Sequence, residues 1–287
     1  MTLYFYYYAL INTMNDLLKR ITEKKQELDK HRPLPSALVK NLEEWFKVEL
    51  TYSSNAIEGN TLTRKETALV VEKGITVKGK TLEEHLEAIN HAEAMDFVKN
   101  LVSKKRQSVT EKNLLDIHRL VLKKIDDDNA GKYRRISVRI AGIEGLVFPN
   151  PLKIPELMRE YFKWLHGKNK NHPVKVAADA HLKLVTIHPF VDGNGRAARL
   201  LLNLLLIQEG YTPAWIKKEN RDAYINSISD AQLNNRSDDY YKTIYQAVDY
   251  SLDMYLKALK GEGDGVMVSN KKQLLKIGEL AQEAGES

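Results

Sequence analysis

Apolar residues recur at helical spacing along almost the whole chain of 287 residues, and this periodicity constrains the fold more than any other feature. Apolar side chains that return every three or four positions predict a helix with one buried face. Pro33, Pro35 and a polar loop at 126–131 interrupt the pattern. We expect helices over residues 16–31, 36–56, 63–72, 82–103, 111–125, 154–166, 174–187, 196–209, 221–234 and 237–260.

Residues 135–147 are the one segment that clearly departs from this pattern. They read RISVRIAGIEGLV, in which apolar and polar side chains alternate before two glycines bracket Ile143 and Glu144. Alternation followed by a glycine-containing turn is typical of a β-hairpin. The expected fold class is therefore all-α, a helical bundle with one small β-hairpin.

Composition excludes several classes of protein. Hydrophobic residues make up 43% and charged residues 29% of the chain, as expected for a globular protein and not for a disordered or collagenous one. The absence of cysteine excludes disulfide scaffolds, cysteine zinc sites and thiol nucleophiles. A net charge of +6 is compatible with a polyanionic ligand but does not require one.

The apolar start of the chain, MTLYFYYYALI, is the one candidate for a targeting signal. It has no basic start and no small-residue cleavage site, and it ends well short of the ~20 residues that a membrane span needs. We interpret it as a packed or pairing N-terminal arm. We expect a cytoplasmic protein without membrane contact.

Residues 188–199, HPFVDGNGRAAR, form a polar loop between two apolar helices. Gly193 and Gly195 allow a tight turn whose N–H groups point into one concavity at the start of the following helix. Helix N-termini of this kind favour phosphate. Arg196 and Arg199 lie three residues apart, so both can reach an anion held there.

Two further side chains of this loop suggest chemistry. Asp192 offers an oxygen ligand for a phosphate-bound Mg²⁺, and the imidazole of His188 can take a proton from a hydroxyl. Together these groups predict transfer of part of a nucleoside triphosphate. A dinucleotide fingerprint fits residues 193–198 formally, but no strand precedes it, and no P-loop motif occurs in the chain. A purely structural turn would need neither the histidine nor the aspartate.

Residues 188–199 resemble the signature H-x-F-x-[DE]-G-N-G-R-x-x-R of the Fic (Fido) domain, and the likeness extends in pattern over about 36–260. Members of this family are helical nucleotidyltransferases, most of which move AMP from ATP to a Ser, Thr or Tyr hydroxyl of a protein. The resemblance implies a general base at His188, a Mg²⁺ ligand at Asp192, a phosphate cradle at Gly193, Asn194 and Gly195, and a nucleotide-binding helix start that continues through Arg196, Ala197, Ala198 and Arg199. Phe190 would anchor the loop in the core.

The same resemblance suggests roles for residues outside the loop. The hairpin would be the flap that aligns the target by strand addition, with Glu144, Gly145, Leu146 and Val147 at its tip beside nucleotide and target. A hairpin that merely covers the core is the alternative. Tyr224 and Gln232 fall where family members contact adenosine, although an ordinary packing or surface role is equally compatible with their positions.

Residues 54–60, SNAIEGN, resemble the inhibitory motif [ST]-x-x-x-E-[GN] of the family. Ser54 and Glu58 lie four residues apart on one helical face, and Gly59 is a natural helix end. A carboxylate paired with Arg199 would occupy the arginine that should grip the γ-phosphate. ATP would then bind in a pose poorly aligned for attack. The alternative is a plain helix C-terminus.

Two of the histidines outside both motifs occupy informative positions on predicted helices. His118 is on an apolar face, which favours a satisfied core histidine. His181 lies two helical turns before His188, where support of the loop and core packing are equally compatible with the sequence.

The chain divides into an N-terminal helical region (1–105) with the inhibitory motif, a catalytic core (106–260), and a linker and tail (261–287). The tail sequence LLKIGELAQEAG resembles the opening of a helix-turn-helix, but no recognition helix follows, so DNA binding is not expected. We expect a self-inhibited protein adenylyltransferase that uses ATP and Mg²⁺ and modifies a protein hydroxyl, on itself or on a target. The alternatives are a hydrolase that removes AMP with Glu58 positioning water, and a nucleotide-sensing binding module linked to transcription.

Overall fold

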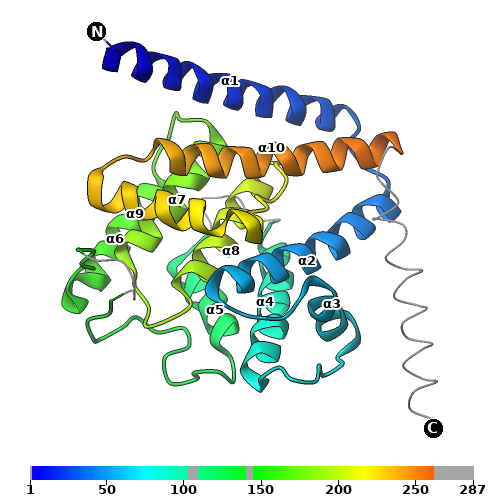
Figure 1. Ribbon diagram of the computed structural model, residues 1–287, viewed down its shortest axis with the longest axis vertical. Coiled ribbons are helices and arrows are strands. Elements are labelled where there is room, and N and C mark those ends of the chain that lie inside the picture. The colour runs from blue at the N-terminus through cyan, green and yellow to red at the C-terminus, as the bar shows by residue number, and fades with distance from the viewer. Residues whose placement is uncertain (1, 103–108, 140–144, 262–287) are drawn as a thin grey trace.

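The computed structural model describes residues 2–102, 109–139 and 145–261, and the side chains within them from residue 14 onward (Figure 1). The described α-helices are α1 (Thr2–Lys30), α2 (Ser36–Glu58), α3 (Arg64–Lys73), α4 (Leu82–Leu101), α5 (Glu111–Leu122), α6 (Ile154–His166), α7 (Pro173–Ile187), α8 (Asn194–Gln208), α9 (Arg221–Asn234) and α10 (Asp238–Lys260). Two short 3-10 helices, η2 (Pro151–Lys153) and η3 (Lys218–Asn220), precede α6 and α9.

The all-α class predicted from the periodicity is confirmed for the described residues, and each predicted helix is present. Most helix ends agree within a few residues because local capping sets them. Thr81 and Glu84, for example, form the reciprocal capping box that begins α4. The largest difference is at the start of the chain, where the helix begins at Thr2 and includes the segment expected to be an arm.

Helix α8 lies at the centre of the bundle and contacts α2, α4, α5 and α7. Its residues from Arg196 to Leu206 are all buried. A helix that is apolar on most sides must be surrounded by other helices, so the leucines at 200–202 and 204–206 explain its central position. The polar start of α8 therefore lies at the rim of the core, where it meets the loop from α7.

Two outer helices complete the bundle. Helix α1 runs alongside α10 in the same direction, so the first and last helices of the described chain lie side by side (Figure 1). Helix α2 packs on α3, α4 and α8 and ends at Glu58, where Gly59 adopts a left-handed φ of 108°. Its last turn thereby reaches the start of α8.

The predicted hairpin is not part of the described fold. Residues 135–139 and 145–147 contain no strand, and residues 140–144, which include Glu144 of the predicted tip, lie outside the described residues. Arg134, which precedes the segment, donates from its guanidinium to the carbonyls of Ile136 (2.9 Å), within it, and Pro149 (2.7 Å), just beyond it. The tail at 262–287 and the junction at 103–108 also lie outside the described residues.

None of the helices in the described part of the chain combines the length and apolar character that crossing a bilayer requires.

Candidate active site

The loop that joins α7 to α8 is fixed by hydrogen bonds to its backbone. The side chain of Asn194 accepts from the N–H of Phe190 and donates to its carbonyl, both at 3.0 Å. On the other side, Arg134 donates from Nε to the carbonyl of His188 at 2.7 Å, and from its backbone N–H to Pro189 at 2.9 Å. Because both sides are tied, the loop presents its side chains in one arrangement.

His188 caps the end of α7 in an uncommon backbone conformation. Its φ and ψ are 50° and 59°, the left-handed region, which costs a residue with a Cβ on the order of 1 kcal/mol. The N–H of His188 bonds the carbonyl of Leu184 at 2.9 Å, and the ring stacks on Phe148 with centroids 3.9 Å apart. These contacts and the bond from Arg134 offset the backbone strain and orient the imidazole.

The hydrogen bonding of His188 defines which ring nitrogen can act as a base. Nδ1 lies 3.2 Å from the carbonyl of Val185, and a carbonyl only accepts, so Nδ1 carries the proton and Nε2 keeps its lone pair. Burial, with a smaller effect of Arg134, lowers the pKa of His188 to about 4. The imidazole is therefore neutral at neutral pH, the form that accepts a proton.

Phe190 anchors the loop in the core, as predicted. It is fully buried, and its ring stacks on His118 with centroids 3.6 Å apart. His118 accepts from the N–H of Gly131 at Nδ1 and donates from Nε2 to the carbonyl of Asp192, both at 2.9 Å. His118 is the satisfied core histidine that the sequence favoured, and it also holds the loop directly.

The start of α8 has the shape of an anion site. Gly193 adopts a φ of 74°, and a Cβ there would press within 3.3 Å of His118, so glycine fits best. The first N–H groups of a helix have no partner within the helix, and its dipole favours negative charge there. A Cβ on Gly195 would overlap the carboxylate of Glu58. The carboxylate of Glu58 therefore lies against the helix start, where the sequence placed a phosphate.

Arg199, one turn into α8, is bound by the two residues of the predicted inhibitory motif. Its guanidinium donates to Oε1 of Glu58 at 2.6 Å, and to the hydroxyl and carbonyl of Ser54 at 2.9 and 3.0 Å. The side chain of Arg199 is 7% exposed and that of Glu58 is 35% exposed. The pairing of Arg199 with Glu58 expected from the sequence is present in the structure.

Arg196 is held by two carboxylates. It donates to Asp192 at 2.8 Å and to Glu87 of α4 at 2.7 Å. Asn60, just beyond α2, donates to the other oxygen of Glu87 at 2.8 Å. Burial is the largest influence on Glu87 and raises the pKa of its carboxyl group. The segment that follows α2 is thus connected to Arg196 through Glu87, while α2 itself binds Arg199.

Three residues of this site were not identified from the sequence: Glu87, Arg134 and Phe148. Glu87 is one of several acids on its helix, and no local pattern distinguishes it. Arg134 and Phe148 flank the predicted hairpin, and only the folded chain brings them to His188. For Arg134 and Phe148, the one signal in the sequence is that they flank the predicted hairpin. This position alone does not indicate that they contact His188.

Other predicted site residues lie in different surroundings. Tyr224 is 1% exposed, and its hydroxyl lies 2.8 Å from Nε2 of His181. Gln232 donates to the hydroxyl of Thr186 at 3.3 Å near the surface of α9. Of the predicted flap tip, Glu144 lies outside the described residues, and Val147 is 86% exposed.

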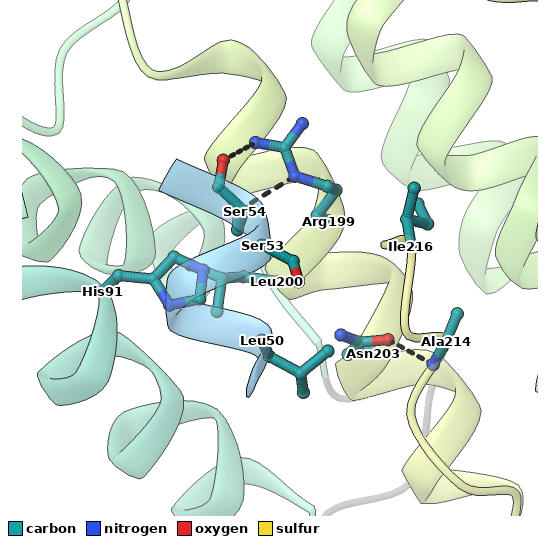
Figure 2. A pocket seen from close by; sticks show the side chains of 9 residues that line it. All are labelled: Leu50, Ser53, Ser54, His91, Arg199, Leu200, Asn203, Ala214 and Ile216. Carbon is teal, nitrogen blue, oxygen red and sulfur yellow. Dashed lines mark hydrogen bonds between the residues drawn. The ribbon is translucent and has the colours of Figure 1, made fainter. Parts of the chain in front are cut away.

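The interface behind Arg199 contains a small cavity of about 20 Å³ between α2 and α8 (Figure 2). Its lining residues are Leu50, Ser53, Ser54, His91, Arg199, Leu200, Asn203, Ala214 and Ile216. A space of this size holds one water molecule, whereas a nucleotide needs several hundred Å³. The cavity belongs to the packing of α2 on α8.

The donor set at the loop suits a metal ion that arrives with its phosphates. The carboxylate of Asp192 is 65% exposed, so it can reach a ligand in solvent. No cluster of three or more His, Asp or Glu side chains in the described ranges is arranged to bind a metal ion. Mg²⁺ is commonly bound by one or two carboxylates plus substrate phosphates, and Asp192 fits this pattern.

Comparisons with known proteins agree on one family. The model of the Fic/DOC family matches residues 108–206. Protein adenylyltransferase Fic of Aedes aegypti is 36% identical over 244 residues, 84% of this chain and 48% of that protein. The protein of the same name from Drosophila mojavensis is 37% identical over 245 residues, 84% of this chain and 47% of its own length. The chain spans about half the length of the curated relatives it matches.

Solved structures show the same architecture. Fic-1 from C. elegans superposes with a TM-score of 0.80 at 29% identity, over 89% of this chain and 75% of that one. A Fic domain containing signaling protein from Bacteroides thetaiotaomicron superposes with a TM-score of 0.77 at 28% identity, over 86% of this chain and 99% of that one. The loop geometry, the family match and these structures agree: the chain carries a Fic/DOC family domain at residues 108–206.

Proposed function

We propose that this protein is an adenylyltransferase that moves AMP from ATP to a Ser, Thr or Tyr hydroxyl, on itself or on a target protein, and that its own α2 inhibits it. The observation that carries the proposal is the position of a neutral His188, with Nε2 available, beside a helix start built for phosphate. Relatives named protein adenylyltransferase Fic support the reaction type.

In the proposed reaction His188 acts as the general base. The target hydroxyl gives its proton to Nε2 while its oxygen forms a bond to the α-phosphorus of ATP. The bond from that phosphorus to the oxygen bridging to the β-phosphate breaks, and pyrophosphate leaves with the electron pair. The hydrogen bond from Nδ1 to Val185 stabilises the imidazolium that forms.

The start of α8 would hold the phosphates. The N–H groups of Gly193, Asn194 and Gly195 form the cradle, and Ala197 and Ala198 keep the helix face behind it small and buried. Arg196 and Arg199 supply positive charge on the same face. Asp192 would hold Mg²⁺, which, when bound, neutralises phosphate charge and favours departure of pyrophosphate.

The target would dock along residues 135–147. Phe148, which follows this segment, stacks on His188, and Arg134 binds carbonyls on both sides of it. Ile136 and Val147 are 59% and 86% exposed, so the segment offers apolar side chains and backbone beside the base. Pairing with an extended target would bring a hydroxyl to Nε2 with little dependence on target sequence.

Inhibition follows from the charge on Glu58. Its carboxylate occupies the guanidinium of Arg199 and lies against the start of α8, so the terminal phosphate of ATP meets negative charge instead of its arginine. A nucleotide that binds without this contact has its α-phosphorus misaligned with the base. Basal activity is therefore expected to be low.

Labelling with ATP carrying ³²P at the α-phosphate tests the proposal. We expect weak self-labelling of the unaltered protein, at least tenfold more in Glu58→Gly, and none when His188→Ala is added to that variant. His31→Ala, which alters an exposed histidine just beyond α1, serves as the control and should label like its parent. Strong labelling that survives loss of His188 contradicts the mechanism, and an unchanged rate in Glu58→Gly contradicts the inhibition.

A second candidate activity is removal of AMP by hydrolysis. It is favoured by the 35% exposure of the Glu58 side chain, which lets the carboxylate orient a water molecule near His188. Incubation with an AMP-modified protein distinguishes the two reactions. Release of AMP that depends on Glu58 supports hydrolysis, and a stable modification supports transfer alone.

A further inference from the structure

Arg196, which follows the predicted phosphate cradle, lies between two carboxylates from different elements. Its guanidinium donates to Oδ2 of Asp192 at 2.8 Å and to Oε1 of Glu87, on α4, at 2.7 Å. The side chains of Arg196, Glu87 and Asp192 are 3%, 14% and 65% exposed, respectively. The contacts therefore run from Glu87, which is largely buried, through a buried guanidinium to Asp192 at the surface. The reaction proposed above uses Asp192 and gives Glu87 no role.

Both carboxylate oxygens of Glu87 are bound within the protein. Oε1 accepts from Arg196, and Oε2 accepts from Nδ2 of Asn60 at 2.8 Å. Asn60 is itself fixed, because Nδ2 also donates to the carbonyl of Glu84 at 3.0 Å and Oδ1 accepts from the N–H of Leu62 at 2.9 Å. A carboxylate that accepts at both oxygens keeps one orientation, so Glu87 holds the guanidinium of Arg196 in one place.

Asp192 is held through its backbone and through one side-chain oxygen. Its carbonyl accepts from Nε2 of His118 at 2.9 Å, and its Oδ2 accepts from Nη2 of Arg196. Arginine and a carboxylate often form two parallel hydrogen bonds. Here Nη1 is directed to Glu87, and the guanidinium meets Asp192 through Nη2 alone. The contacts made by the described residues therefore leave Oδ1 of Asp192 available to a cation in solvent.

We propose that Glu87 is a positioning residue for the metal, because it compensates the charge of Arg196 and turns its guanidinium so that Asp192 keeps one oxygen for Mg²⁺. This inference rests on the proposed function, in which the Mg²⁺ arrives with ATP. Without the charge of Glu87, Arg196 would attract Asp192 more strongly, and the metal ion would compete with a buried cation for one carboxylate. Removing a group that orients a metal ligand commonly lowers metal affinity about 10- to 100-fold.

Stability alone does not account for the pair of Glu87 and Arg196. The cost of burying two charges is about as large as their attraction, so apolar side chains of similar size would stabilise the same contact equally well. Glu93 of α4 offers a comparison, because its side chain is 42% exposed and pairs at 2.7 Å with Lys123, which is not part of the loop at 188–199. Glu93→Gln makes the same chemical change on the same helix and is a matched control.

ATP binding with and without metal tests the proposal in a protein that carries Glu58→Gly and His188→Ala, so that α2 is not inhibitory and ATP is not consumed. Calorimetry with saturating Mg²⁺ and with excess EDTA gives the factor by which Mg²⁺ raises the affinity for ATP. Adding Glu87→Gln should lower this factor about tenfold without weakening metal-free binding. Adding Glu93→Gln should change neither affinity. Equal weakening by Glu87→Gln in both conditions, or no effect, overturns the proposal.

A double-mutant cycle shows whether Glu87 acts through Asp192. Asp192→Asn in the same protein should remove most of the effect of Mg²⁺ on the affinity for ATP. Adding Glu87→Gln to Asp192→Asn should then change the remaining factor less than twofold, because the carboxylate that Glu87 supports is gone. A further decrease as large as that in the protein with Asp192 would mean that Glu87 acts on the metal through its charge alone, and it overturns the positioning role.

A second variant, Asn60→Ala, retains the charge of Glu87 and removes one of the two contacts that orient it. It should lower the metal factor about threefold, and it replaces Glu87→Gln as the test if that variant does not fold. An unchanged factor then overturns the proposal. If Mg²⁺ does not affect ATP binding in the starting protein, the positioning role fails while AMP transfer by Glu58→Gly still supports the proposed function. If Glu58→Gly transfers no AMP while Glu87→Gln lowers the metal factor, the proposed function fails and the positioning role stands.

Discussion

At the scale of single residues, the protonation state of His188, the proposed general base, is defined by what surrounds its ring. Burial, with a smaller effect of the nearby Arg134, favours the neutral form, and the carbonyl of Val185 fixes the tautomer in which Nε2 is free. An exposed histidine would be protonated in part of the molecules near neutral pH, and those molecules would have no free base. Here burial removes the competing protonated form before any substrate binds.

The pH dependence of transfer should reflect this lowered pKa. Because His188 has a pKa of about 4 instead of 6.5, the base is lost only as the pH falls toward 4. In Glu58→Gly, kcat/KM for AMP transfer is expected to change less than twofold between pH 6 and 8. Initial rates measured with α-labelled ATP check this, and an acid limb with a midpoint near 6.5 would contradict it.

At the scale of secondary-structure elements, the position of α2 pairs Arg199 with Ser54 and Glu58. The last turns of α2 are held by side chains from outside the helix. Trp215 donates to the hydroxyl of Ser53 at 2.9 Å, and Arg221 donates from Nε to the carbonyl of Ile57 at 2.7 Å. The bond from Arg221 satisfies a carbonyl that the end of the helix leaves without a partner.

Loosening this end of α2 should raise activity without altering the inhibitory residues. Arg221→Met removes the hydrogen bond to Ile57 and should weaken the seated position of α2 by about 1 kcal/mol, which corresponds to about fivefold more self-labelling. Asp222→Ala is the matched control, because it removes the exposed partner of Arg221 and leaves the bond to Ile57. Equal labelling of Arg221→Met and the unaltered protein would show that this bond does not hold α2 in place.

At the scale of the whole molecule, the core around α8 contains neutral histidines from three other helices. His91 of α4, His118 of α5 and His181 of α7 are each at most 2% exposed. Burial, with smaller effects of the charges of Arg196 and Arg199, lowers the pKa values of these three to about 3, 4 and 3. The bundle is therefore built around two buried guanidinium groups and uncharged imidazoles.

This arrangement predicts a protein that loses stability in mild acid. Below pH 6.5 the unfolded chain binds protons at these histidines while the folded chain does not, so the free energy of unfolding falls as the pH falls. The three groups together contribute up to about 4 kcal/mol per pH unit between 6 and 5. Urea unfolding at pH 7.5, 6.5 and 5.5 measures the slope.

One variant assigns part of that slope. His118→Gln should reduce the change of the free energy of unfolding with pH by the contribution of about one bound proton, whatever its effect on stability at pH 7.5. A free energy of unfolding that is constant from pH 7.5 to 5.5 is incompatible with neutral imidazoles in the core.

Much of the fold was predictable because its signals are local. Helical periodicity placed each helix, and capping residues such as Thr81 and Gly59 marked where helices begin and end. The alternation at 135–147 is also local, but a strand needs a partner to bond, and the described part of this segment binds Arg134 instead. What this segment binds therefore depends on Arg134, whose side chain is held by the loop that joins α7 to α8.

The sequence by itself determined the helical bundle and the contiguous loop of residues 188–199, because periodicity, glycines and loop chemistry act between neighbours in the chain. Only the tertiary structure decided which distant groups meet that loop. Glu58 reaches Arg199 across 141 positions of sequence, and the hydroxyl of Tyr224 meets His181 across 43. Contacts between remote residues depend on how helices pack, and no local pattern encodes that packing.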